Sequence, residues 1–171
     1  MTSKSAMARR AAVLALALMV VAASAGAVAK PGVITDIAGT YSLTKRVMVD
    51  GTTISSPQIM ALYTLKGGRG NFNLFLRNKD GSLASESTIS RYTLDARQYC
   101  EWMLFTTRDN LDGPGFTHEP PPVENHCSPI THRAGRLEYA PAGESVTVSF
   151  GPEGFTANIA GQFTDTWARV R

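Results

Sequence analysis

Apolar and polar residues alternate in short segments from residue 39 onward, with the two-residue period of β-strands. Gly, Pro, Asn and Asp separate these segments, as turns require. We predict strands over 39–49, 59–66, 71–77, 87–94, 97–106, 136–140, 144–150, 155–159 and 163–171. No segment of the chain after the N-terminal region keeps a helical period over three turns. The pattern therefore predicts an all-β fold, an antiparallel up-and-down meander of roughly 8–10 strands.

A meander of this size can form a sandwich or a closed barrel, and closure pairs the edge strands that would otherwise be exposed. We therefore predict a barrel. About eight strands leave an interior that side chains fill or that holds one small ligand.

The first predicted strand lies in AGTYSLTKRVMVDGT, which resembles the start of the bacterial lipocalin-like domain, where Gly-Thr-Trp begins a strand leading to an Asp-Gly turn. Gly39, Thr40 and Tyr41 carry the match. Tyr63 with the glycine-rich turn at 67–70, and the later segment SRYTLD, also resemble this family. The resemblance implies a lipocalin-like barrel with a ligand cavity, a fold that serves both binding proteins and enzymes.

Two features depart from the lipocalin pattern. Tyr41 stands where lipocalins usually have Trp, and the arginine that packs over that ring in the family would here be Arg169 or Arg171. The last predicted strand is also not followed by the helix that lipocalins proper carry.

The first 29 residues have the three parts of a secretory signal peptide. A basic start precedes an apolar run over 11–23, and Ala-Val-Ala at 27–29 fits the cleavage site. The run is shorter than the roughly 20 residues of a spanning helix. We expect 1–29 to be removed, and 30–171 to form a single domain without a membrane span, in the periplasm or secreted.

Removal of the signal peptide changes the charge balance. The chain has 17 Lys and Arg against 14 Asp and Glu, and three of the basic residues but no acidic residue lie in 1–29, which leaves 14 against 14. Without net positive charge or a basic stripe, the chain lacks the electrostatic signature of a nucleic-acid-binding protein. We expect a monomer with no nucleic-acid partner and no cofactor.

Cys100 and Cys127 are the only cysteines of the chain. An even number in an exported protein favours one disulfide. The alternative is two free thiols, one of them a nucleophile or metal ligand. A bridge would close a loop of about 27 residues and stabilise the fold by roughly 3–4 kcal/mol in the chain-entropy model.

The segment 108–133 carries no strand signal and contains all three histidines. Loops of this length are usually functional or disordered, but Cys127 and five prolines would tether and stiffen this one. We predict an ordered loop across one mouth of the barrel. The histidine spacings match no known zinc pattern, so we expect no metal site. We favour surface histidines, and one histidine facing the cavity is the alternative.

Further candidates come from strand parity. Trp102 shares its parity with Cys100, which predicts a core position. Asp165 and Glu101 each lie within a strand, where a buried carboxylate could act as acid or base. Asp165 shares its parity with Phe163 and Trp167, and we favour an outer-face or rim position for these rings, with Asp165 exposed or paired with an arginine. The ligand-binding candidates are Tyr41, Trp102, His118, His126 and Asp165.

Two function classes fit the predicted barrel. The first is an exported protein that binds a small apolar or amphipathic molecule. The second is an isomerase, cyclase or hydratase that uses a carboxylate or histidine in the cavity. A third, weaker hypothesis is an inhibitor or interaction module that presents the proline-rich loop. Strand register decides which side chains face inward, because a shift of one residue exchanges the two faces of a strand.

Overall fold

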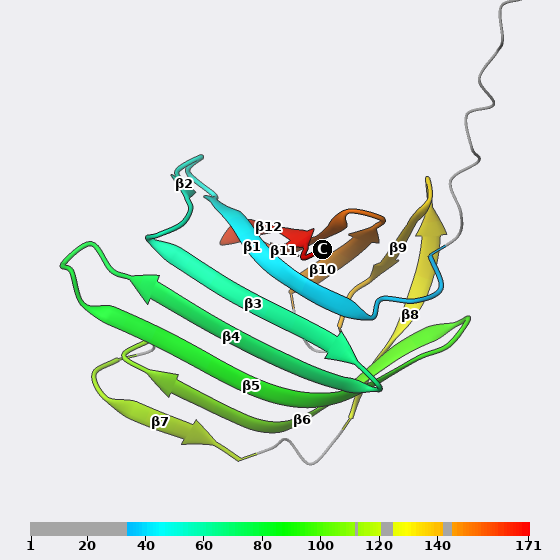
Figure 1. Cartoon of the computed structure of the whole chain (residues 1–171), viewed down its shortest axis with the longest axis horizontal. Helices are drawn as coiled ribbons and strands as arrows, with labels where there is room; N and C mark the ends of the chain where they lie inside the picture. The colour runs from blue at the N-terminus through cyan, green and yellow to red at the C-terminus, as the bar shows by residue number, and fades with distance from the viewer. Residues whose placement is uncertain (1–33, 112, 121–124, 142–144) are drawn as a thin grey trace, which may run out of the picture. The chain divides into compact units, whose positions relative to one another are not determined.

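Twelve strands and no helix occur in the computed structural model, which describes residues 34–171 apart from 112, 121–124 and 142–144 (Figure 1). The strands are β1 (Gly39–Met48), β2 (Thr53–Ile54), β3 (Ile59–Lys66), β4 (Arg69–Arg77), β5 (Leu83–Leu94), β6 (Gln98–Asp109), β7 (Phe116–Glu119), β8 (His126–Arg133), β9 (Arg136–Tyr139), β10 (Val146–Gly151), β11 (Gly154–Ile159) and β12 (Phe163–Arg169). The predicted all-β class is confirmed. The described residues include no helix long and apolar enough to cross a membrane. The proposed signal peptide, 1–29, lies outside the described residues.

Ten of the strands close into an antiparallel barrel. The circuit runs β1-β3-β4-β5-β6-β8-β9-β10-β11-β12, and β12 pairs with β1 to complete it. β2 adds to β1, and β7 adds to β6. Figure 1 shows β3 to β6 as one broad curved wall. The predicted up-and-down meander that closes into a barrel is therefore confirmed.

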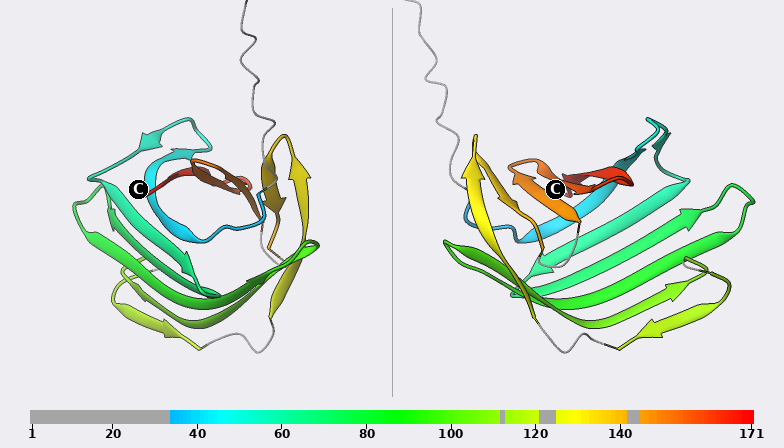
Figure 2. Two further views of the ribbon diagram at one scale, coloured as in Figure 1. Left: turned by 45° about the vertical axis from the view of Figure 1, so that its right-hand side comes forward. Right: turned by 180° about the vertical axis from the view of Figure 1, so that it is seen from behind.

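The prediction that 108–133 is a loop without strands was wrong, because this segment contains β7 and β8. The two strands pair with opposite ends of β6, β7 with its last four residues and β8 with its first four (Figure 2). Neither strand alternates apolar and polar residues, and β7 is exposed along its whole length. Pairing with β6 thus overrides weak local propensity. Residues 121–124, which include two of the three consecutive prolines, lie outside the described residues.

β1 contains an irregularity that changes which residues face inward. Leu43 pairs with Trp167 and Lys45 with Thr166, so Thr44 has no partner in the register. One extra residue in one strand of a pair is a β-bulge, and it exchanges the faces of the strand. Arg46 and Met48 therefore share the face of Asp165 and Phe163. Val47 and Val49 share the sequence parity of Tyr41, but the bulge places them on the opposite face, and Val49 is 77% exposed.

Aromatic side chains dominate the barrel core. Tyr41, Tyr99 and Phe150 are almost fully buried, together with Leu65 and Leu137. Tyr99 and Tyr139 stack with ring centroids 4.3 Å apart, and Phe155 stacks on Trp167 at 5.2 Å. Such ring pairs add specific contacts to the burial of apolar area.

Candidate functional site

Tyr41 has a structural role in the core. Its hydroxyl donates to the carbonyl oxygen of Ile37 at 2.8 Å and accepts from Nη2 of Arg169 at 3.0 Å. The Arg169 guanidinium carbon lies 5.4 Å from the ring centroid. Gly39 leaves room for this contact, because a Cβ there would be 3.2 Å from the Arg169 guanidinium. Burial raises the pKa of Tyr41, although Arg169 opposes that rise.

Of the two candidate arginines, Arg169 is the one that packs beside Tyr41, whereas Arg171 pairs with Glu153 on the surface. The closed barrel and this contact are compatible with a calycin-like fold.

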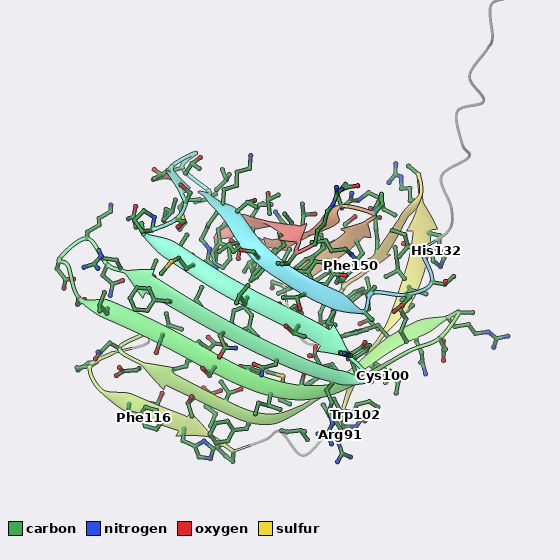
Figure 3. The ribbon with its side chains drawn as sticks, in the orientation of Figure 1. Arg91, Cys100, Trp102, Phe116, His132 and Phe150 are labelled. Carbon is green, nitrogen blue, oxygen red and sulfur yellow. A yellow bond between two sulfur atoms is a disulfide. The ribbon has the colours of Figure 1, made fainter. Side chains whose placement is uncertain are left out.

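Trp102 lies on the outer face of β6, so its predicted core position was wrong. The residues on either side of it along the chain, Glu101 and Met103, pair with Tyr92 and Ser90, both of which are buried. Trp102 instead pairs with exposed Arg91, and Figure 3 shows the two side chains close together. Trp102 is therefore not a ligand contact inside the barrel.

The three histidines lie apart. His118 is exposed on β7 and contacts the Phe105 ring, with centroids 4.8 Å apart. His132 lies toward the far end of β8 (Figure 3) and pairs with Leu137. Among the described residues, no group of three or more His, Cys, Asp or Glu side chains could hold a metal ion. His126 differs, because it pairs directly with Glu101 and is only half-buried. Opposite residues of an antiparallel pair share a face, so His126 faces inward beside Glu101.

Asp165 is buried inside the barrel and bound to Arg46. The Arg46 guanidinium donates to both carboxylate oxygens, Nε to Oδ1 at 2.7 Å and Nη2 to Oδ2 at 2.8 Å. Its carbon also lies 3.5 Å from the centroid of the Phe163 ring. The favoured interpretation placed Phe163 and Trp167 on the outer face or at a rim, with Asp165 solvated or paired with an arginine. The arginine pair is present, but the predicted face was wrong, because Asp165 and Trp167 are each only 4% exposed inside the barrel. A carboxylate held in this way is a poor candidate for acid–base chemistry.

Glu101 is the centre of a second polar cluster inside the barrel. Its Oε1 accepts a hydrogen bond from the Ser90 hydroxyl at 2.7 Å and a longer one from the Tyr63 hydroxyl at 3.3 Å. Burial raises the pKa of Tyr63 well above its usual value, and the nearby Glu101 carboxyl and Tyr139 hydroxyl add to the rise. The pKa of Tyr99 is raised by burial and then by Tyr63, Tyr139 and Glu101. The tyrosines of the cluster therefore stay protonated at neutral pH.

Polar atoms inside the barrel retain unused hydrogen-bonding capacity. Among the described residues, three buried polar atoms form no hydrogen bond of normal geometry: the Tyr99 hydroxyl, the Ser128 hydroxyl and the Trp167 indole nitrogen. Buried polar atoms normally have a partner in the protein or a bound molecule. The Tyr99 hydroxyl lies near Glu101 and Tyr63, and Ser128 is the register partner of Tyr99.

Gly70 makes room for the Glu101 cluster. It pairs with Ser90, and a Cβ at position 70 would lie 2.3 Å from the Ser90 hydroxyl oxygen. We expect Gly70→Ala to lower the free energy of unfolding by about 1–3 kcal/mol, because either that hydroxyl or the strand pair must shift. Chemical denaturation measures the change. Adding Ser90→Ala should restore part of the stability, and a double variant no more stable than Gly70→Ala would exclude this clash as the cause.

An apolar groove lies where β1 and β3 separate. The two strands pair only from Gly39 to Ser42 of β1, and β1 then continues along β12 and β2. The groove at this gap has a volume of about 420 Å³. It is lined by Ser42, Leu43, Ser56, Met60, Ala61, Leu62, Asn73, Leu74 and Phe75. Leu43 and Ala61 are buried core residues, whereas Met60 and Leu62 are on the outer face, so the groove spans the edge of the barrel wall.

Sequence reasoning placed the groove residues other than Ser56 in strands, but not around a common opening. The opening depends on where β1 changes partner, and no local pattern encodes that change. Glu101 was identified as a strand carboxylate, and its pairing with His126 required β8, which the sequence did not predict.

Comparison of the chain with protein-family models, with curated proteins and with solved structures gives no match, so its function is inferred from the barrel, the groove and the groups inside the barrel.

Proposed function

We propose that this protein binds a small apolar or amphipathic molecule in the groove between β1 and β3. The observation that carries the proposal is the groove itself, an apolar recess of about 420 Å³ in the wall of a closed barrel. Binding sites for small molecules are typically about 300–1,000 Å³ and lined mainly by apolar side chains with a few polar groups. Ser42, Ser56 and Asn73 supply the polar groups here.

The proposal places this binding outside the cytoplasm, in the periplasm or beyond the cell. The signal-like pattern of 1–29 supports export. Cys100 and Cys127 support it as well, because their sulfur atoms are 2.05 Å apart and disulfides persist in oxidising compartments.

Leu62→Asp should weaken the binding of a neutral apolar fluorescent probe roughly tenfold, because a charge at the lip of the groove opposes burial of apolar surface. Titration of the probe into the wild type and the variant measures the two dissociation constants. Ile89→Asp is the matched control. Ile89 is 43% exposed on β5 and Leu62 is 49% exposed, but Ile89 does not line the groove. Equal weakening by both substitutions would place the probe elsewhere.

Native mass spectrometry of the exported protein tests the proposal without a chosen probe. We expect a fraction of the protein to carry an organic adduct that organic solvent removes. If the protein carries no adduct and takes up no apolar probe, the proposed binding function is wrong.

The pairing of Glu101 with His126 favours one alternative, an isomerase, cyclase or hydratase of the same fold. A carboxylate and an imidazole that converge with a neutral tyrosine hydroxyl could move protons on a bound molecule. The two functions differ in the fate of the ligand. The ligand extracted from the protein is incubated again with fresh protein and then analysed by chromatography and mass spectrometry. A binding protein leaves the ligand unchanged, whereas an enzyme converts it into a product with a different retention time or mass.

A further inference from the structure

Glu101 differs from the other inward-facing carboxylates in having no cationic partner. Asp165 pairs with Arg46, and Glu86 pairs with Arg108 at 3.2 Å. Among the described residues, Glu101 accepts hydrogen bonds only from two neutral hydroxyl groups, and both reach Oε1. No Lys, Arg or His of the described residues forms an ion pair with it, and this includes His126 across the strand pair. Its second oxygen, Oε2, is therefore available to a ligand.

Aromatic rings surround this carboxylate. Tyr63 contacts the Phe72 ring edge-on at 6.0 Å, and both rings face inward while remaining partly exposed. The stacked rings of Tyr99 and Tyr139 lie on β6 and β9, the two strands that flank β8. Aromatic faces attract cations, by about 0.5–1 kcal/mol at exposed sites and more where water is excluded. A carboxylate among aromatic rings is thus a suitable environment for a positively charged group.

Tyr99 indicates which kind of cation fits. Its hydroxyl is buried near Glu101 and near the Tyr63 hydroxyl, and it forms no hydrogen bond of normal geometry among the described residues. A primary ammonium group has three donors, and it could use both Oε2 of Glu101 and the Tyr99 oxygen. A quaternary ammonium group has no donor and would satisfy neither. Glu101 itself is only half-buried, so the cluster is not sealed from solvent.

We propose that the barrel interior at Glu101 binds the primary ammonium group of an amphipathic alkylamine. The inference rests on the proposed function, because it adds a head-group site inside the barrel to a protein that binds amphipathic molecules; Glu101 itself does not line the groove. A charge-assisted hydrogen bond in a partly buried site is stronger than a neutral one. The protein should therefore prefer an amine over an alcohol of the same chain length.

Calorimetric titration with decylamine and with decanol tests the inference. We expect the wild type to bind decylamine roughly 10- to 100-fold more tightly than decanol. Glu101→Gln should abolish that preference and leave decanol binding unchanged. Glu153→Gln, which neutralises an exposed carboxylate in the turn between β10 and β11, should keep the preference.

The possible results separate the two proposals. Equal affinity of the wild type for both ligands, or a preference that survives Glu101→Gln, overturns the ammonium site but leaves the binding function standing. Failure of the wild type to bind either ligand or any apolar probe overturns both. If Glu101→Gln does not fold, the amine-to-alcohol ratio of the wild type decides the inference alone.

Discussion

Replacing Arg46 with methionine should lower the free energy of unfolding by about 3–5 kcal/mol, because the Asp165 carboxylate then stays buried without its partner. The side chains of Arg46 and Asp165 are only 13% and 6% exposed, so solvent screens the charge poorly. The substitution also removes the guanidinium from the face of Phe163. Asp165→Asn should also be destabilising, because it leaves the buried Arg46 cation without its anionic partner. Denaturant midpoints measure both effects.

The double variant Arg46→Met/Asp165→Leu is the control for this ion pair. Removing both charges eliminates the buried unpaired group, and apolar replacements of buried ion pairs are often neutral or stabilising. We therefore expect the double variant to be more stable than either single variant, with a coupling energy above about 1 kcal/mol. If the free energy of unfolding of each single variant falls by less than about 1 kcal/mol, then water reaches the ion pair and solvates the remaining charge.

The strands were predictable where two-residue alternation coincides with strong turn residues. β3 and β4 illustrate this, since buried and exposed residues alternate along β3 and a glycine-rich turn separates the two strands. Closure of the barrel followed from the same pattern, because a meander leaves two edges that can pair. β7 and β8 could not be predicted in this way. β7 is short and exposed, and four of the eight residues of β8 are exposed. β7 pairs with β6, and β8 pairs with β6 and β9.

The candidate site was harder to predict because it depends on register. The bulge at Thr44 turns Arg46 inward, although the alternation of the sequence favours Val47. On β6, the set of Cys100, Trp102 and Leu104 is more apolar than the set of Tyr99, Glu101 and Met103, so the sequence favours the first set for the inner face. The inner face nevertheless carries the second set. Tyr99 packs against the other rings of the aromatic core, and Glu101 accepts hydrogen bonds from Ser90 and Tyr63. Sequence patterns thus identified the strands and not their faces.

Replacing both Cys100 and Cys127 with alanine should lower the free energy of unfolding by about 3.5 kcal/mol in the chain-entropy model, since the bridge spans 27 residues. For a domain of this size the melting temperature should fall by roughly 10 °C. The bridge joins β6 to β8, and only four residue pairs connect these two strands. The barrel circuit passes through this short pairing. Removing the disulfide should therefore open the contact between β6 and β8 before the broad wall of β3 to β5 is affected.

Hydrogen exchange distinguishes this local effect from a uniform loss of stability. We expect backbone amides of β8 and β9 to exchange faster in the double alanine variant, and amides of β4 and β5 to change less. His126 and Glu101 lie next to the bridge in the register, so opening of β8 should also separate these two side chains. If the amides of β8 and β5 accelerate equally, the disulfide stabilises the whole fold and does not hold the barrel closed at β8.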